Sequence, residues 1–160
     1  RGLCGDHKAS GAGWRASGGS EWGVHKAVGL GEETGSGRAI MLPVSAPSHR
    51  CLMAPAARAV RHALVKVEKH NPVVPVVANV RAAPVTDAEE IANLLVTQVT
   101  GQVRWRETVE WFGANGVTTL YEVGSGKVLT GLARRIDKNI SGVAVNAPAD
   151  IDAAIAAILG

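Results

Sequence analysis

His49 is the residue whose position best suits catalysis. It follows a short apolar run of strand length, residues 39–45, and it directly precedes a segment with helical periodicity. In an open α/β sheet, ligands and catalytic groups gather at the carboxyl ends of the strands. A histidine in that position can accept a proton near neutral pH and act as a general base. A structural or merely exposed histidine is the competing interpretation.

Gln98 is a second residue of interest, because it shares the apolar face of a predicted helix. It lies seven, four and three residues after Ile91, Leu94 and Leu95. A buried amide without hydrogen-bond partners costs ~1–3 kcal/mol, so a glutamine on this face needs an explanation. Two interpretations stay open: the amide reaches water at the rim, or it orients another group.

Several common kinds of site are not predicted. The stretch 124–127, Gly-Ser-Gly-Lys, suggests a phosphate loop, but that pattern needs a glycine at Tyr121 and a serine or threonine at Val128. It therefore reads as a glycine turn between a strand and a helix. No Gly-x-Ser-x-Gly elbow presents a nucleophile. The five histidines show no ligand spacing, so no metal site is expected.

Strands and helices alternate along most of the chain. We expect strands over 39–45, 73–80, 117–123 and 143–145, and helices over 53–67, 87–95, 105–112, 128–136 and 148–159. Asp87 and Glu90 resemble a capping box, and Gly116 is placed to end a helix. This alternation predicts an α/β fold with a parallel sheet covered by helices on both faces.

Composition narrows the possible functions. The chain has 160 residues, 46% of them apolar, a mean hydropathy of +0.10 and two cysteines, which predicts a soluble, cytoplasmic globular protein rather than a disulfide scaffold. No apolar run approaches the ~18 residues that span a bilayer, and no leader precedes one. Aromatic residues are 4%, too few for a nucleic-acid stacking platform. The net charge of +3 suits an acidic partner.

Residues 1–37 differ from the rest of the chain. They hold eleven of the nineteen glycines and only four scattered aliphatic residues, Leu3, Val24, Val28 and Leu30. Glycine at this density has a large ordering entropy and little apolar burial to offset it. We expect this segment to be poorly structured and the folded domain to span residues 38–160.

Three stretches of the domain together resemble the malonyl-CoA:acyl carrier protein transacylases of bacterial fatty-acid synthesis. They are LPVSAPSH at 42–49, QVTGQVRW at 98–105 and YEVGSGKVLTGL at 121–132. The resemblance runs in order from Arg38 to about Ile155. It implies the carboxyl-terminal half of an α/β-hydrolase-like large domain, with the last strand of a ferredoxin-like subdomain remaining at about 38–45.

The resemblance also implies an activity. His49 would be the base that activates a serine, and the backbone carbonyl of Gln98 would hold its imidazole. Malonyl would pass from coenzyme A to the serine, and then to the phosphopantetheine thiol of acyl carrier protein. Malonyl-CoA would be a substrate and acyl carrier protein the partner, with no cofactor, metal, nucleic acid or membrane involved.

The chain departs from this family in two respects. The family's serine elbow, oxyanion-hole residues and malonyl-binding arginine lie in an amino-terminal half that matches no part of this sequence, so the chain alone is expected to be inactive. Residues 1–37 do not resemble the subdomain expected there. They read as a shifted reading frame of GC-rich DNA, or else as a divergent leader.

Two alternatives stay open for the function. One is a fragment of a polyketide-synthase acyltransferase domain, which has the same fold and mechanism. The other is a non-catalytic module that binds acyl carrier protein, with Arg134 and Arg135 contacting the acidic carrier.

Overall fold

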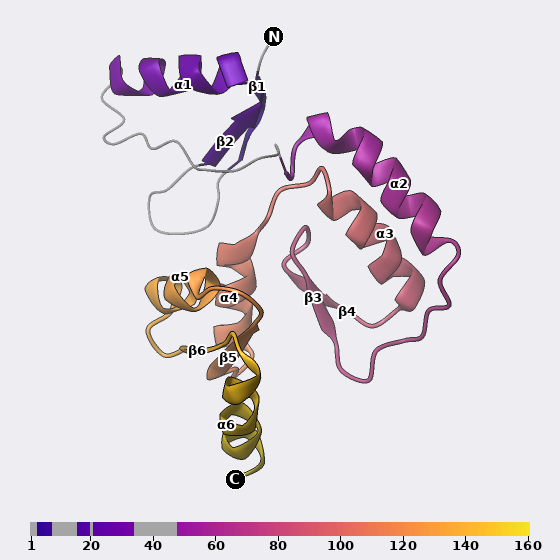
Figure 1. Cartoon of the computed structure of the whole chain (residues 1–160), viewed down its shortest axis with the longest axis vertical. Coiled ribbons are helices and arrows are strands. Elements are labelled where there is room, and N and C mark those ends of the chain that lie inside the picture. The colour runs from indigo at the N-terminus through magenta and orange to yellow at the C-terminus, as the bar shows by residue number, and fades with distance from the viewer. Residues whose placement is uncertain (1–2, 8–15, 20, 34–47) are drawn as a thin grey trace. The chain divides into compact units, whose positions relative to one another are not determined.

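The described part of the chain comprises residues 3–7, 16–19, 21–33 and 48–160 of a computed structural model (Figure 1). These residues form two compact units, one ending at Arg104 and the other beginning at Trp105. The strand expected over 39–45, including the remnant of a ferredoxin-like subdomain, falls outside the described residues.

The first unit begins with a pair of antiparallel strands and a helix. Strand β1 (Leu3–His7) pairs with β2 (Ala16–Gly19), and helix α1 (Glu21–Glu33) follows. The sequence did not predict these elements within residues 1–37. A local contact favours the helix despite its glycines, because the Lys26 ammonium lies 5.1 Å from the ring centroid of Trp22, four residues earlier.

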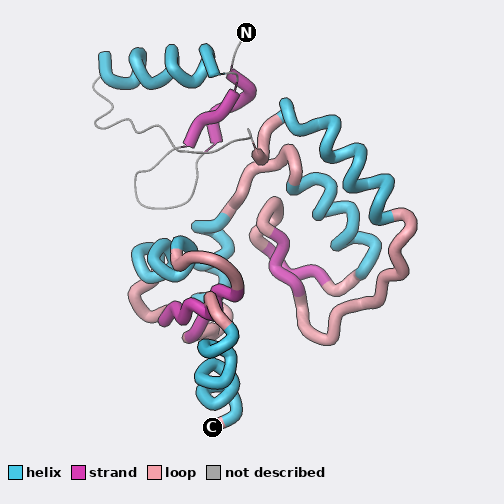
Figure 2. The backbone as a smooth tube through the Cα atoms, in the orientation of Figure 1, coloured by secondary structure: helices cyan, strands magenta, loops and turns pink. Residues whose placement is uncertain are grey.

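Two helices lie side by side in the same unit (Figures 1 and 2). A 3-10 turn, η1 (Cys51–Met53), leads into α2 (Ala54–Leu64), and α3 (Ala88–Gln98) packs against it through the buried Ala92 and Val96. The predicted cap of α3 is confirmed, since Asp87 Oδ1 accepts a hydrogen bond of 2.7 Å from the Glu90 amide. The Glu90 side chain pairs with Arg81 instead of returning to the cap.

The prediction of one strand over residues 73–80 is wrong. Only Val76–Ala78 is a strand, β3, and it forms an antiparallel hairpin with β4 (Ala83–Val85). Val73 and Val74 are exposed. The physical reason is that Pro72 and Pro75 carry no amide hydrogen for a ladder, so the β-branched run cannot pair as a central strand.

The second unit alternates helices and strands as predicted. Helix α4 (Trp105–Ala114) is followed by β5 (Thr119–Val123), α5 (Val128–Ile136), β6 (Ser141–Val145) and α6 (Pro148–Leu159). Strands β5 and β6 pair in parallel, from Thr119 opposite Ser141 to Val123 opposite Val145. Val109, Ala133 and Ile140 form the buried core between the helices and this sheet. The α/β class is confirmed, while the finer hydrolase-like description stays a prediction.

Candidate functional site

The backbone around His49 holds the residue in an unusual conformation. His49 is half-buried just before η1, and its φ of 60° lies in the left-handed region, which costs a non-glycine residue roughly 1–2 kcal/mol. Its amide donates a hydrogen bond of 3.1 Å to the Val99 carbonyl. The main chain of His49 is therefore anchored to the segment that ends α3, at a backbone geometry that tertiary contacts must maintain.

Gln98 occupies the last position of α3, where backbone carbonyls extend beyond the intrahelical hydrogen-bond ladder. The His49 ring uses this position, because its Nδ1 lies 2.8 Å from the Gln98 carbonyl oxygen. The Gln98 amide nitrogen also lies 3.0 Å from Nδ1. The structure thus brings together two predicted site residues that are 49 positions apart. Their catalytic roles stay predictions.

The geometry defines what this pair can do chemically. A carbonyl oxygen can only accept a hydrogen bond, so Nδ1 carries the hydrogen, and Nε2 is the nitrogen that can take up a proton. The carbonyl lies at the negative end of a helix macrodipole, where a hydrogen-bond donor such as Nδ1–H is favoured. The pair therefore has the arrangement of a general base and the group that orients it.

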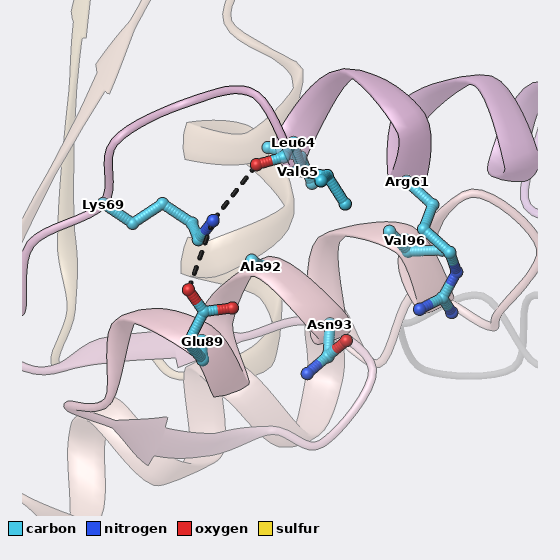
Figure 3. A pocket seen from close by; sticks show the side chains of 8 residues that line it. All are labelled: Arg61, Leu64, Val65, Lys69, Glu89, Ala92, Asn93 and Val96. Atoms are coloured by element: carbon cyan, nitrogen blue, oxygen red, sulfur yellow. Dashed lines mark hydrogen bonds and ion pairs between the residues drawn. The ribbon is translucent and has the colours of Figure 1, made fainter.

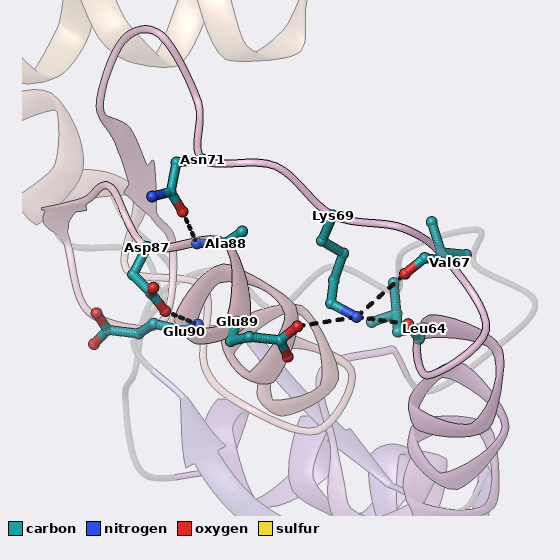
Figure 4. Close-up of polar contacts among 8 residues, drawn as sticks. All are labelled: Leu64, Val67, Lys69, Asn71, Asp87, Ala88, Glu89 and Glu90. Carbon is teal, nitrogen blue, oxygen red and sulfur yellow. Dashed lines mark hydrogen bonds and ion pairs between the residues drawn. The ribbon is translucent and has the colours of Figure 1, made fainter.

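A set of polar contacts around Lys69, here called the polar clamp, joins the carboxyl-terminal end of α2 to the amino-terminal end of α3 (Figure 4). Lys69 Nζ lies 3.2 Å from Glu89 Oε1, and it donates hydrogen bonds of 3.1 Å and 3.2 Å to the carbonyls of Leu64 and Val67. Asn71 Oδ1 accepts a bond of 2.9 Å from the Ala88 amide. Because α2 starts shortly after His49 and α3 ends at Gln98, this clamp supports the two helices that carry the pair.

A small hollow beside the clamp is not a substrate site (Figure 3). Its volume is about 70 Å³, room for only a few waters and not for an acyl-CoA. It is lined by Arg61, Leu64, Val65, Lys69, Glu89, Ala92, Asn93 and Val96.

Residues 124–126 form a glycine turn between β5 and α5, as predicted. Gly124 and Gly126 have φ values of 132° and 99°, which only glycine adopts readily. The amides that begin α5 are occupied by a carboxylate, because Glu122 accepts hydrogen bonds of 2.8 Å from Thr130 and 3.1 Å from Leu129. These bonds, that of Thr130 first, hold the pKa of Glu122 below its ordinary value.

Basic side chains gather at the end of α5. Arg134, Arg135 and Lys138 are exposed and line an open hollow with Gly131. None of the three pairs with an acidic side chain in the part of the chain that the structure describes. Their charge is thus available to an anionic partner.

Metal-binding clusters and membrane-spanning helices are both absent from the described ranges. No group of three histidine, cysteine, aspartate or glutamate side chains there could hold a metal ion. Among the same residues, no helix is both long enough and apolar enough to cross a bilayer.

Known proteins match the chain over most of its length. It is 46% identical over 132 residues to the malonyl CoA-acyl carrier protein transacylase of Salmonella typhimurium, and the match covers 82% of this chain. The chain belongs to the malonyl CoA-acyl carrier protein transacylase family. It spans 43% of the length of that relative, less than half of it. No family model matches the chain.

Solved structures agree with this family assignment. The acyl-carrier-protein-S-malonyltransferase of Bartonella henselae matches with a TM-score of 0.83 and 48% identity, over 98% of this chain and 50% of that chain. A malonyl-transacylase in complex with a type II PKS acyl-carrier protein matches with a TM-score of 0.85 and 38% identity, over 96% of this chain and 50% of that chain. These matches, like that to the Salmonella typhimurium relative, extend into residues 1–37, beyond the three stretches on which the resemblance was based.

Sequence reasoning missed two features of this candidate site. The polar clamp at Lys69 leaves no motif, since its partners lie in two helices and a loop. The side-chain contact between Gln98 and His49 was signalled only by an amide on an apolar helix face, which did not identify its partner.

Proposed function

We propose that this chain supplies the base and its orienting group to a malonyl-CoA:acyl carrier protein transacylase. The observation that carries the proposal is the 2.8 Å contact between His49 Nδ1 and the Gln98 carbonyl, which leaves Nε2 as the proton acceptor. The family membership supports the substrates, malonyl-CoA and acyl carrier protein.

Both half-reactions use the same nitrogen. In the first, His49 Nε2 takes the proton of a serine hydroxyl while the serine oxygen attacks the malonyl thioester, and the proton then passes to the departing coenzyme A sulfur. In the second, Nε2 takes the proton of the phosphopantetheine thiol while its sulfur attacks the seryl ester. The imidazolium then returns that proton to the serine oxygen.

The serine comes from the part of the full-length transacylases that this chain does not span. The 160 residues contain no Gly-x-Ser-x-Gly elbow. A base without its nucleophile gives little rate enhancement. We therefore expect this chain alone to transfer no malonyl, and the complete enzyme that contains it to do so.

The test compares two histidine variants in the complete enzyme. His49→Ala should lower malonyl transfer to acyl carrier protein by ~10²–10⁴-fold, the usual contribution of a general base. His62→Ala is the matched control, since His62 is exposed on α2. Equal activity of the two variants would refute the proposal.

The basic cluster at the end of α5 supports acyl carrier protein as the partner. Replacing Arg134 and Arg135 by serine should raise the KM for acyl carrier protein and make that KM less dependent on salt concentration. The KM for malonyl-CoA should not change. Arg58→Ser, an exposed arginine on α2, is the control. Carrier binding by this chain without any transfer in the complete enzyme would instead favour a non-catalytic binding module.

A polyketide-synthase acyltransferase stays the second candidate, because one matching transacylase is solved with a type II PKS acyl-carrier protein. Transfer rates to carriers from fatty-acid and polyketide synthesis distinguish the two functions. The shifted-frame origin of residues 1–37 is a separate proposal, which the DNA sequence from upstream of codon 1 through codon 40 tests directly.

A further inference from the structure

Two groups of Gln98 contact the same nitrogen of His49. The backbone carbonyl oxygen lies 2.8 Å from Nδ1, and the side-chain amide nitrogen lies 3.0 Å from it. Nδ1 has room for one hydrogen or one lone pair in the plane of the ring. The two contacts therefore constrain each other.

The backbone contact decides whether Nδ1 carries a hydrogen or a lone pair. A carbonyl oxygen only accepts, so a hydrogen bond of 2.8 Å requires a hydrogen on Nδ1. An amide NH₂ group only donates, and at 3.0 Å it would direct a second hydrogen at the first. The reverse arrangement, a bare Nδ1 accepting from the amide, would set the lone pairs of Nδ1 and the carbonyl against each other.

Rotating the side-chain amide of Gln98, so that its oxygen and nitrogen exchange places, removes the conflict. The oxygen and nitrogen of a glutamine amide have nearly the same shape, and the hydrogen-bond network decides which occupies a given place. We propose that the Gln98 side chain presents its oxygen to His49, so that Nδ1–H donates to both the backbone and the side-chain oxygen of one residue.

This arrangement makes the Gln98 side chain a positioning group for the base. Two oxygens hold the Nδ1–H tautomer, and both stabilise the imidazolium that forms when Nε2 takes a proton. The bond from the His49 amide to the Val99 carbonyl fixes the residue from its main chain. The catalytic consequence rests on the proposed function, whereas the tautomer does not.

The tautomer is measured on the 160-residue chain by long-range proton–nitrogen spectra of ¹⁵N-histidine, at a pH above ordinary histidine titration. His49 should be protonated on Nδ1, and the exposed His62 should show the mixture of a solvated imidazole. In Gln98→Leu the backbone carbonyl still holds the Nδ1–H tautomer, but the Nδ1 hydrogen loses one of its two acceptors, so its chemical shift and its rate of exchange with water should change. Gln98→Glu, which keeps a side-chain oxygen, should restore the hydrogen bond. An Nε2–H tautomer in the wild type, or an Nδ1 hydrogen whose shift and exchange are the same in Gln98→Leu, would overturn the proposal.

Kinetics of the complete enzyme provide a second readout. Gln98→Leu should lower kcat for malonyl loading about tenfold, the value of one hydrogen bond to a charged group, with little change in KM for malonyl-CoA. Gln98→Glu should recover most of the loss. If Gln98→Leu loads at the wild-type rate while His49→Ala does not, the amide proposal fails and the proposed function stands. If His49→Ala also loads normally, the proposed function fails.

Discussion

The imidazole of His49 is held by the end of a helix, with Nδ1 2.8 Å from the carbonyl oxygen of Gln98. A carbonyl in the last turn of a helix has no amide four residues further along to satisfy it, so it can serve a side chain instead. The position of the His49 imidazole consequently depends on how α3 is formed and on how it packs against α2.

The cap of α3 should contribute measurably to stability. Asp87→Ala removes the acceptor of the Glu90 amide and should lower the free energy of unfolding by about 1 kcal/mol. Urea unfolding followed by circular dichroism measures the change. Asp152→Ala, an exposed aspartate on α6, is the control. Equal midpoints for the two variants would contradict the role of the cap.

The Lys69 clamp should stabilise the pair of helices that carries the site. Lys69→Met keeps the apolar stem but loses the bonds to Leu64, Val67 and Glu89, and it should cost ~1–2 kcal/mol of unfolding free energy. Lys66→Met, at an exposed neighbouring position, should cost little. The clamp has no structural role if both variants unfold at the same urea concentration.

Acid should weaken the second unit through Glu122 and Asp150. Backbone amides, chiefly those of Thr130 and Ala147 respectively, lower the pKa of each carboxyl. A carboxyl with a lowered pKa in the folded state contributes stability that is present above its unfolded pKa, about 4. That stability is lost as the pH falls further, through the lower folded pKa.

Urea unfolding between pH 3 and pH 7 measures this dependence. Glu122→Gln should make the loss of stability below about pH 4 shallower. Glu32→Gln, an exposed glutamate on α1, should follow the wild-type curve. Parallel curves for the wild type and Glu122→Gln would show that the helix-end bonds do not govern the acid response.

Helix α6 presents an apolar face that should cause the isolated chain to associate. Ile151, Ile155 and Ile158 are 47%, 47% and 62% exposed, at spacings that place them on one side of the helix. Sedimentation velocity should show oligomers, which Ile155→Lys should reduce more than Ala153→Lys, a matched charge elsewhere on α6. A monomeric wild-type chain with a sharp cooperative melt would contradict this expectation.

Local patterns in the sequence were sufficient to predict much of the fold. Asp87 caps α3 because the acceptor and the amide are three residues apart, and Gly116 follows α4 with a φ of 78° because only glycine adopts that conformation readily. The strand over 73–80 failed because the prediction gave its β-branched composition more weight than Pro75, whereas in the structure the missing amide hydrogens of Pro72 and Pro75 decide.

The site could be predicted only in part. His49 was singled out by its place after a strand, and the resemblance to the transacylases paired it with Gln98. No spacing predicts a contact across 49 residues, because that contact depends on how α2 and α3 pack. The left-handed backbone of His49 was also beyond prediction, since ordinary propensities disfavour it.

The most direct test of His49 as the base is the single-turnover rate of malonyl loading in the complete enzyme. His49→Ala should bind malonyl-CoA with near wild-type affinity and release coenzyme A ~10²–10⁴-fold more slowly, because the serine then has no proton acceptor. His62→Ala should load at the wild-type rate. Loading at the wild-type rate by His49→Ala would contradict the assignment of the base.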